Sequence, residues 1–297
     1  MRVLVTGGSG FIGHHVVARL RARGDSVRVV DLIGFDDPEV ECVTGDLRDP
    51  TVVAEAMEGG FDAVVHLAAL TSVLVSVNDP HGTYETNVAA TEHLLEASRR
   101  LGVGHFVLAS SSAVVGNVGR TPINEQIVPR PLTPYGATKA AGEMLLSAYS
   151  SSYGIITSAL RFTNVYGAGM ALKDSVIARL LRAAAQGSGI EIYGDGEQSR
   201  DYLYVTDAAR AVELGLGLDH SEVVSIGGER SISMNDLYAL TCEVTGVAIP
   251  AVHGAARPGE MPAVIVDMRH AHELGFQPEL ALREGLEAAW EDFKKTV

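Results

Sequence analysis

The fold is decided by the first residues of the chain, which read Arg2-Val3-Leu4-Val5-Thr6-Gly7-Gly8-Ser9-Gly10-Phe11-Ile12-Gly13. The β-branched run predicts a strand over 2–6, and the apolar spacing after the glycines predicts a helix over 11–23. A glycine turn in this setting is typical of dinucleotide-binding folds: Gly7 permits a sharp turn, and Gly10 lets backbone N–H groups approach a pyrophosphate. Gly13 allows close packing of helix and strand. Taken alone, the G-x-x-G-x-x-G spacing also fits a tight turn that binds nothing.

Strands and helices continue to alternate after this turn. We expect strands near 2–6, 27–31, 40–44, 62–66, 104–109 and 155–161, and helices near 11–23, 50–58, 84–101, 135–152 and 279–295. This rhythm predicts an α/β fold with a Rossmann-like, doubly wound parallel sheet. Glycines punctuate shorter elements beyond residue 165, which indicates a smaller C-terminal lobe. We therefore expect a dinucleotide-binding domain over 1–165, which also receives 200–227, and a substrate lobe over 166–199 and 228–297.

Composition narrows the class of protein. The 297 residues have a formal net charge of −14, so the surface should repel nucleic acid and anionic membranes, and we expect neither as a partner. Two cysteines, Cys42 and Cys242, cannot form a disulfide framework or a four-ligand zinc site, and we expect no metal. No apolar stretch approaches a membrane span, and the first strand leaves no room for a signal peptide. The cytoplasm is the expected compartment by elimination.

Asp31 closes the second expected strand, about twenty residues after the glycine turn. At that place a carboxylate can accept hydrogen bonds from the adenosine ribose and repels a 2′-phosphate. No arginine follows within 32–37, so NAD is favoured over NADP. Asp46 and Leu47 could flank the adenine, and the segment after the fourth strand, His66-Leu67-Ala68-Ala69, could line the path of the cofactor. We assign His66 itself no chemistry.

Ordered motifs along nearly the whole chain resemble one enzyme family. The motifs are Thr6–Gly13, His66–Ala69, Asn87, Ser110–Gly116, Pro134–Lys139, Arg161–Gly167, Gly194–Tyr202 and Arg257–Glu260. They are similar to those of extended short-chain dehydrogenases/reductases, specifically nucleotide-sugar 4-epimerases such as UDP-glucose and UDP-glucuronate 4-epimerases. One departure is Val115, where the family commonly has tyrosine.

The resemblance implies roles for particular residues. For NAD binding it implies Gly7, Gly10, Phe11, Ile12, Gly13, Asp31, Asp46, Leu47, Leu67, Ala68, Ala69, Asn87, Ser110, Tyr135 and Lys139. For catalysis it implies Ser112, Tyr135 and Lys139, with Ser112 bonding the sugar oxygen and relaying a proton. For the sugar nucleotide it implies Ser111, Ser112, Tyr135, Asn164, Arg200 and Arg257.

Tyr135 and Lys139 also make chemical sense as a pair. They are four residues apart in a helical stretch opened by Pro134, so both side chains share one face. A phenol with a pKa near 10 needs roughly 4 kcal/mol of preferential stabilisation to act as a base near pH 7. Lys139 and the positive nicotinamide could supply this energy together. Tyr135 would then remove the proton of the sugar 4-hydroxyl while the C4 hydride passes to NAD, and return of the hydride to the other face would invert C4.

The substrate side depends on isolated basic residues. Arg200 and Arg257 suit a diphosphate in an acidic protein, which is favoured over their pairing with Asp201 and Glu260 at the surface. Lys173 or Arg179 could meet a hexuronate carboxylate, or could be solvated helix charges. UDP is favoured as the nucleotide only because the family members that look closest use it.

Several other functions share this fold. A 4,6-dehydratase needs an acid and a base, an Asp-Glu pair after the active-site hydroxyl in such relatives, where this chain has Ala113 and Val114. A nucleotide-4-keto-sugar reductase, a UDP-glucuronate decarboxylase and a non-catalytic dinucleotide-binding protein remain as alternatives. The family likeness also implies a homodimer through helices 84–101 and 135–152. Their apolar faces are Val88, Leu94 and Leu95, and Met144, Leu145 and Ala148, although burial within one chain would explain these faces as well.

Overall fold

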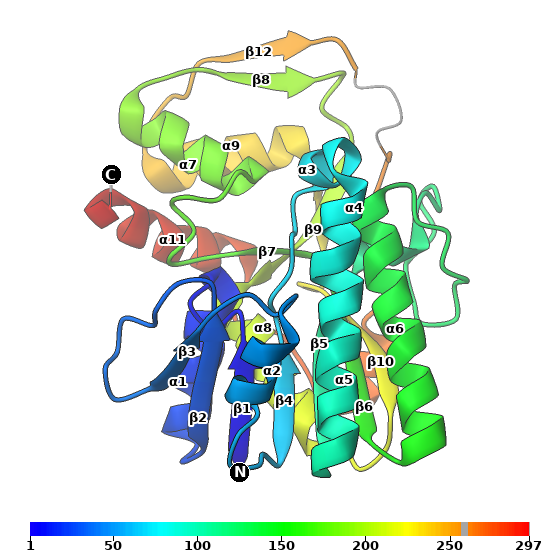
Figure 1. The fold of residues 1–297 in the computed structure, drawn as a ribbon. Coiled ribbons are helices and arrows are strands. Elements are labelled where there is room, and N and C mark those ends of the chain that lie inside the picture. Colours follow the sequence, from blue (N-terminus) through cyan, green and yellow to red (C-terminus); the bar gives the residue numbers. More distant parts are fainter. Residues whose placement is uncertain (257–260, 297) are drawn as a thin grey trace. The chain divides into compact units, whose positions relative to one another are not determined.

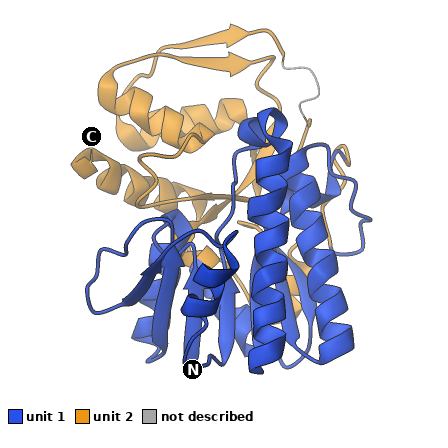
Figure 2. Cartoon of the chain, in the orientation of Figure 1, with its two compact units in different colours: residues 1–117, 125–162, 209–225 blue, residues 118–124, 163–208, 226–297 orange. Residues whose placement is uncertain are grey.

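The computed structural model describes residues 1–256 and 261–296, and its contacts divide the chain into two units (Figures 1 and 2). The first unit consists of residues 1–117, 125–162 and 209–225, and the second of 118–124, 163–208 and 226–297. The division of the chain into a cofactor-binding domain and a substrate lobe, with the functions expected from the sequence, stays a prediction.

The first unit is built on a seven-stranded sheet in the order β10-β6-β5-β4-β1-β2-β3 (Figure 1). The strands are β1 Arg2–Thr6, β2 Ser26–Asp31, β3 Glu41–Thr44, β4 Ala63–His66, β5 His105–Ser111, β6 Ile156–Phe162 and β10 Glu222–Ile226. The pairs from β6 to β3 are parallel, as the alternation of strands and helices predicts. The predicted doubly wound α/β fold is therefore confirmed. Strand β10 is not among the strands expected from the sequence.

Helices connect these strands. They are α1 Phe11–Ala22, α2 Pro50–Ala56, α3 Val73–Asn78, α4 Pro80–Tyr84, α5 Ala90–Leu101, α6 Pro134–Tyr153 and α8 Val205–Gly217. A five-residue π-helix, η1 Glu85–Ala89, joins α4 to α5, and a 3₁₀ turn, η2 Ser112–Val115, follows β5. The core of this unit gathers apolar side chains of the central strands and of α5, including Leu4, Val64, Phe106, Leu94 and Leu95.

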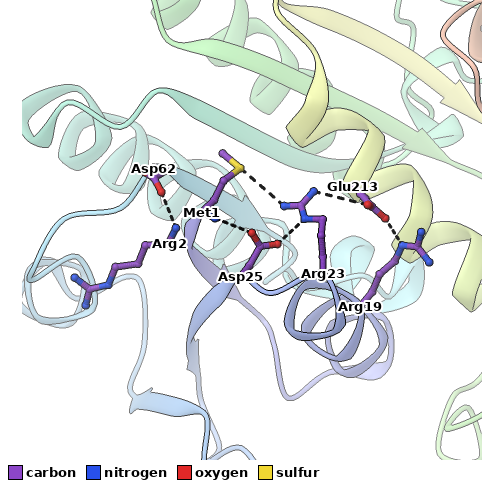
Figure 3. Close-up of polar contacts among 7 residues, drawn as sticks. All are labelled: Met1, Arg2, Arg19, Arg23, Asp25, Asp62 and Glu213. Carbon is purple, nitrogen blue, oxygen red and sulfur yellow. Dashed lines mark hydrogen bonds and ion pairs between the residues drawn. The ribbon is translucent and has the colours of Figure 1, made fainter.

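Polar contacts secure the first residues of β1 (Figure 3). The amino group of Met1 lies 2.8 Å from Asp25 Oδ1, and Arg23 Nε lies 2.6 Å from Asp25 Oδ2. The backbone N–H of Arg2 donates to Asp62 Oδ2 at 2.6 Å. These bonds join the start of β1 to the turns before β2 and β4.

The second unit contains two small sheets. One has the order β11-β9-β7, formed by Ser231–Ser233, Ser199–Tyr204 and Asn164–Tyr166, and the other pairs β8 Ile190–Tyr193 with β12 Ala251–Gly254. Its helices are α7 Val176–Gln186, α9 Met234–Thr245, α10 Arg269–Glu273 and α11 Leu282–Thr296. Within the described part of the chain, no helix has both the length and the apolar character needed to cross a membrane.

Candidate active site

The glycine turn after β1 has the geometry that its sequence predicts. Gly7 has φ +69°, and a Cβ there would stand 2.6 Å from the backbone nitrogen of Ala68. A Cβ on Gly13 would stand 2.2 Å from the carbonyl oxygen of Gly7, so only glycine lets α1 approach the turn this closely. Gly10 is the N-cap of α1 and provides no side chain to cap the helix. The first turn of α1 therefore presents its positive end without a capping side chain, which suits a phosphate group.

Asp31 ends β2 beside this turn. Its Oδ2 accepts from the backbone N–H of Ser9 at 3.0 Å, and its Oδ1 accepts from Ile33 at 3.4 Å. The carboxylate is thus held next to the turn, where a ribose hydroxyl could reach it. Asp46 has an ion-pair partner, because Arg48 Nη2 lies 2.6 Å from its Oδ2. The hydrogen bond from Arg48 lowers the pKa of Asp46.

Asn87 lies in the π-helix η1 and is nearly buried. Its Oδ1 accepts from the backbone N–H of Leu70 at 2.8 Å, and its Nδ2 donates to the carbonyl of Leu70 at 3.0 Å. The same Nδ2 also lies 3.0 Å from the hydroxyl of Thr138 in α6. Asn87 therefore joins the segment after β4, which contains Leu67, Ala68 and Ala69, to the helix with Tyr135 and Lys139.

The Tyr135 side chain is positioned by the start of α6. Thr133 caps this helix by accepting from the backbone N–H of Gly136 at 3.2 Å. A Cβ on Gly136 would stand 2.7 Å from the carbonyl oxygen of Ala113, so this glycine brings α6 close to η2. The sequence analysis did not single out Gly136.

The Tyr135 side chain hydrogen-bonds Ser111, and burial raises the pKa of Tyr135 although this bond opposes the rise. The hydroxyl of Ser112 instead donates to the carbonyl of Phe162 at 3.3 Å. Of the two adjacent serines, the structure therefore brings Ser111 to the phenol.

Lys139 lies one turn further along α6 and is buried. Its Nζ donates to the carbonyl oxygen of Ala109 at 2.7 Å, which fixes the ammonium beneath the end of β5. Burial lowers the pKa of Lys139 to about 8. The sequence predicts that an ammonium favours the phenolate of Tyr135, but in the chain by itself burial raises the pKa of Tyr135.

A buried ion pair supports α6 behind these groups. Arg161 of β6 donates to Glu143 through Nε at 2.9 Å and through Nη2 at 2.8 Å. Ser110, an expected cofactor contact, donates its hydroxyl to Glu143 Oε1 at 2.5 Å. Because all three side chains are buried, this cluster fixes α6 against the ends of β5 and β6.

The second unit holds the expected substrate residues. Asn164 Nδ2 donates to the carbonyl of Asp201 at 3.0 Å, and Arg200 Nη1 donates to the carbonyl of Ser199 at 2.8 Å. Burial raises the pKa of Asp201 to about 7. Arg257 and Glu260 lie outside the described residues. Arg179, considered for a hexuronate, forms an ion pair with Asp174 at 2.5 Å.

A cavity of about 350 Å³ in this unit was not foreseen from the sequence. Residues of α7 and β8 form much of its lining. They include the apolar Val176, Leu180, Ile190 and Ile192 and the charged Arg179, Arg182 and Glu191. Gln198 donates to the carbonyl of Tyr193 at 3.1 Å. Within residues 1–256 and 261–296, no cluster of three or more His, Cys, Asp or Glu side chains could hold a metal ion.

A family model described as "NAD dependent epimerase/dehydratase family" matches residues 3–227. The chain belongs to this family. The motif-based resemblance is thereby confirmed, the chain is an enzyme, and its cofactor is NAD.

Individual relatives agree with this membership. A putative UDP-glucose 4-epimerase of Methanocaldococcus jannaschii is 34% identical over 292 residues, which cover 96% of this chain and 95% of that protein. The structure of a Thermotoga maritima UDP-glucose 4-epimerase with UDP-glucose has a TM-score of 0.94 at 36% identity, covering 100% of this chain and 99% of that one. MoeE5 in complex with UDP-glucuronic acid and NAD has a TM-score of 0.93 at 38% identity, with 100% of both chains covered.

Proposed function

We propose that this protein is an NAD-dependent epimerase that inverts C4 of a UDP-hexose or UDP-hexuronate through a transient 4-keto sugar. The observation that supports this most strongly is the hydrogen bond between Tyr135 and Ser111, with Lys139 buried one helical turn away. Such an arrangement suits removal of a hydroxyl proton and its later return. The relatives named for UDP-glucose 4-epimerase activity support the same reaction.

The residues of the glycine turn fit the cofactor. A side chain at Gly13 would prevent the close contact between α1 and the turn. Asp31 lies beside that turn, and residues 32–37 contain no arginine. We assign Gly7, Gly10 and Gly13 to the pyrophosphate and Asp31 to the adenosine ribose. The chemistry that bound NAD supplies is reversible hydride exchange with C4 of the sugar.

In the proposed mechanism, Tyr135 removes the proton from the sugar 4-hydroxyl and later returns it. We assign the relaying hydroxyl to Ser111 in place of Ser112, because Ser111 is the serine that bonds the phenol. Lys139 holds a positive charge beneath the end of β5 at neutral pH, since its pKa lies at about 8. That charge favours the ionised phenol once the positive nicotinamide is also present.

The absence of an acid and base next to the hydroxyl argues against dehydration. With Ser111 as the active hydroxyl, the next two residues are Ser112 and Ala113, and neither has a carboxyl group. Elimination across C5 and C6 would need such a group. The proposed reaction therefore stops at the 4-keto sugar and its reduction.

For the substrate, we assign Asn164, Arg200 and Arg257 to the nucleotide diphosphate, and the cavity lined by Leu180 and Ile192 to the nucleoside. A cavity of this size, lined by apolar and charged side chains and by Gln198 just before the strand that contains Arg200, suits a base joined to a diphosphate. MoeE5 structures with UDP-glucose and with UDP-glucuronic acid make both sugars the first substrates to test.

The test is to incubate the purified protein with UDP-glucose, UDP-glucuronate or dTDP-glucose, without added cofactor, and to follow the sugars by proton NMR. We expect one sugar to convert to its C4 epimer and the Tyr135→Phe variant to be nearly inactive. Consumption of NADH or NADPH with a 4-keto sugar, without epimerisation, would instead indicate a ketoreductase. Bound NAD without any turnover would indicate a non-catalytic protein.

We also propose a homodimer through α5 and α6. Leu94 and Leu95 belong to the core of the chain itself, so they are not available to a partner. Met144 and Ala148 of α6 are exposed and supply the apolar face instead. Light scattering should give twice the chain mass, and Met144→Glu should lower it; a monomer mass for the wild type would reject the dimer. The two free cysteines are consistent with the cytoplasm as the proposed compartment.

A further inference from the structure

Three polar side chains lie buried together at the carboxyl ends of β1 and β4 and at the start of α5. They are Thr6, His66 and Thr91, of which His66 is 2% exposed and both threonines are fully buried. Thr6 Oγ1 lies 2.7 Å from His66 Nδ1, and His66 Nε2 lies 3.0 Å from Thr91 Oγ1. Both ring nitrogens of His66 are therefore hydrogen-bonded.

The partners at each end decide the direction of these bonds. Thr91 Oγ1 lies 2.7 Å from the backbone carbonyl of Asn87, and a carbonyl can only accept. The hydroxyl proton of Thr91 is thus donated to the Asn87 carbonyl. The Thr91 oxygen must therefore accept a hydrogen bond from a proton on His66 Nε2. In the neutral ring Nδ1 then has no proton, so it accepts from the hydroxyl of Thr6. Thr6 Oγ1 accepts in turn from the backbone N–H of Ala68 at 3.2 Å.

Every bond in this chain therefore runs in one direction, from Ala68 through Thr6, His66 and Thr91 to Asn87. Reversing the tautomer of His66 would place two lone pairs against each other at Thr91 and two protons against each other at Thr6. A charged ring would likewise turn an N–H at Nδ1 toward the Thr6 hydroxyl, whose own proton would then lose His66 as its acceptor. The arrangement accepts only the neutral ring with its proton on Nε2.

The environment keeps the ring neutral. Burial, together with the positive charge of Lys139, lowers the pKa of His66 to about 3. The direction of the bonds is therefore maintained throughout the neutral pH range.

Both ends of this chain reach the cofactor site. Ala68 packs against the glycine turn, since its nitrogen lies 2.6 Å from the place of a Cβ on Gly7. At the other end, Asn87 lies in the π-helix η1, where the backbone N–H of Ala90 reaches back five residues to the carbonyl of Glu85. A π-turn weakens regular helical bonding, so the extra bond from Thr91 to the Asn87 carbonyl stabilises it there.

We propose that His66 is a positioning residue, whose single neutral tautomer holds the 67–70 segment and Asn87 in the arrangement that binds NAD. This inference rests on the cofactor site described above but not on the sugar or on the direction of the reaction. His66 acts through Thr6 and Thr91 and itself touches no reacting atom.

Matched threonine variants test the proposal. Thr91→Val and Thr6→Val remove one hydroxyl each with little change in shape, whereas Thr91→Ser and Thr6→Ser retain it. We expect each valine variant to bind NAD roughly ten- to hundredfold more weakly than the wild type, with the serine variants close to the wild type. Binding is measured by calorimetry on the full chain freed of cofactor, and unfolding is followed in parallel. A valine variant that loses stability but binds NAD with unchanged affinity would overturn the proposal.

The tautomer can be read directly on the wild-type protein, so the proposal stays testable if a variant fails to fold. Nitrogen-15 NMR of labelled histidine, assigned with His66→Gln, should show a proton on Nε2 and no titration between about pH 5 and pH 8. A proton on Nδ1, or a midpoint near the ordinary histidine value, would contradict the proposal. Because NAD binding is measured without sugar, failure here is distinguishable from failure of the epimerase assignment, which only turnover reports.

Discussion

The side chain of Tyr135 hydrogen-bonds Ser111, the second of three consecutive serines at the end of β5. Ser112 begins the 3₁₀ turn η2, and its hydroxyl donates a hydrogen bond to the carbonyl oxygen of Phe162. Adjacent residues at a strand end point in different directions, so a shift of one residue changes which hydroxyl faces the phenol. Because β5 ends at Ser111, we assign the proposed proton relay to Ser111 rather than to Ser112.

Alanine substitution at the two serines separates their roles. We expect Ser111→Ala to lower kcat by roughly a hundredfold, because the hydroxyl that bonds the phenol and is proposed to relay the proton is lost. Ser112→Ala removes only a bond to a backbone carbonyl, and we expect less than about a tenfold change. Steady-state kinetics on the epimerised sugar measures both. A larger loss for Ser112→Ala would return the relay to Ser112.

The ionisation of Tyr135 should depend on the cofactor. In protein freed of NAD, burial raises the pKa of this phenol, so Tyr135 should ionise above about pH 10. Between the ordinary tyrosine pKa and the raised pKa of the folded chain, Tyr135 is ionised in the unfolded chain but still protonated in the folded one. The free energy of unfolding therefore falls as the pH rises through this range. Ultraviolet difference titration of the wild type against Tyr135→Phe measures the pKa, and added NAD should lower it. A pKa near 7 without NAD would mean that Lys139 alone activates the phenol.

The glycine turn offers a steric test of the cofactor site. Gly13→Ala places a Cβ 2.2 Å from the Gly7 carbonyl oxygen, so α1 must move away from the turn. We expect a loss of about 1–3 kcal/mol in stability and purification without bound NAD. Gly217→Ala is the control, because a Cβ there meets nothing within 4 Å. Normal NAD content in purified Gly13→Ala would contradict the proposal that the NAD pyrophosphate binds at the glycine turn.

The Glu143 and Arg161 pair should be important for stability. Glu143→Ala leaves the Arg161 guanidinium buried without its carboxylate, which costs about 3–5 kcal/mol when such a pair is broken. Urea unfolding measures this loss. Glu96→Ala removes a half-buried carboxylate at the surface that is bonded to Arg99 and Arg100, and it should leave the unfolding midpoint nearly unchanged. Equal effects would show that burial does not matter at Glu143.

Asp25 should link stability to pH. Burial raises its pKa, but hydrogen bonds from Arg23 and the amino group of Met1 outweigh this and lower the pKa on balance (Figure 3). A lowered carboxyl pKa adds stability that is present above about pH 4 and is lost as the pH falls further. Asp25→Asn should therefore cost about 1 kcal/mol at pH 7 and less at pH 3. Thermal unfolding at both pH values measures the difference, and an equal cost at both would refute the linkage.

Much of the fold is predictable from sequence because its signals are local. The apolar runs at 2–6 and 62–66 and the periodic stretch at 135–152 correspond to β1, β4 and α6 within a few residues. β10 was missed because five residues at a sheet edge, far along the chain, have no distinctive pattern.

Parts of the site could not be predicted for a different reason. The π-helix around Asn87 depends on the buried hydroxyl of Thr91, and the close approach of α6 to η2 depends on Gly136 and the Ala113 carbonyl. The contacts of Thr91 with His66 and of Gly136 with Ala113 join segments far apart in the sequence, and nothing in the local sequence marks them. The close contact of Gly13 with the carbonyl oxygens of Gly7 and Gly8, in contrast, lies within residues 7–13, so the local sequence predicts it.

The central claim is that the hydride taken from C4 returns to the same sugar on the opposite face. The most direct measurement uses UDP-glucose or UDP-glucuronate deuterated at C4, incubated with the protein and an excess of unlabelled NADH, and followed by NMR and mass spectrometry. The account predicts that the C4 epimer forms and retains deuterium at C4. An epimer that has lost its deuterium, or a sugar reduced by the added NADH without inversion, would contradict it.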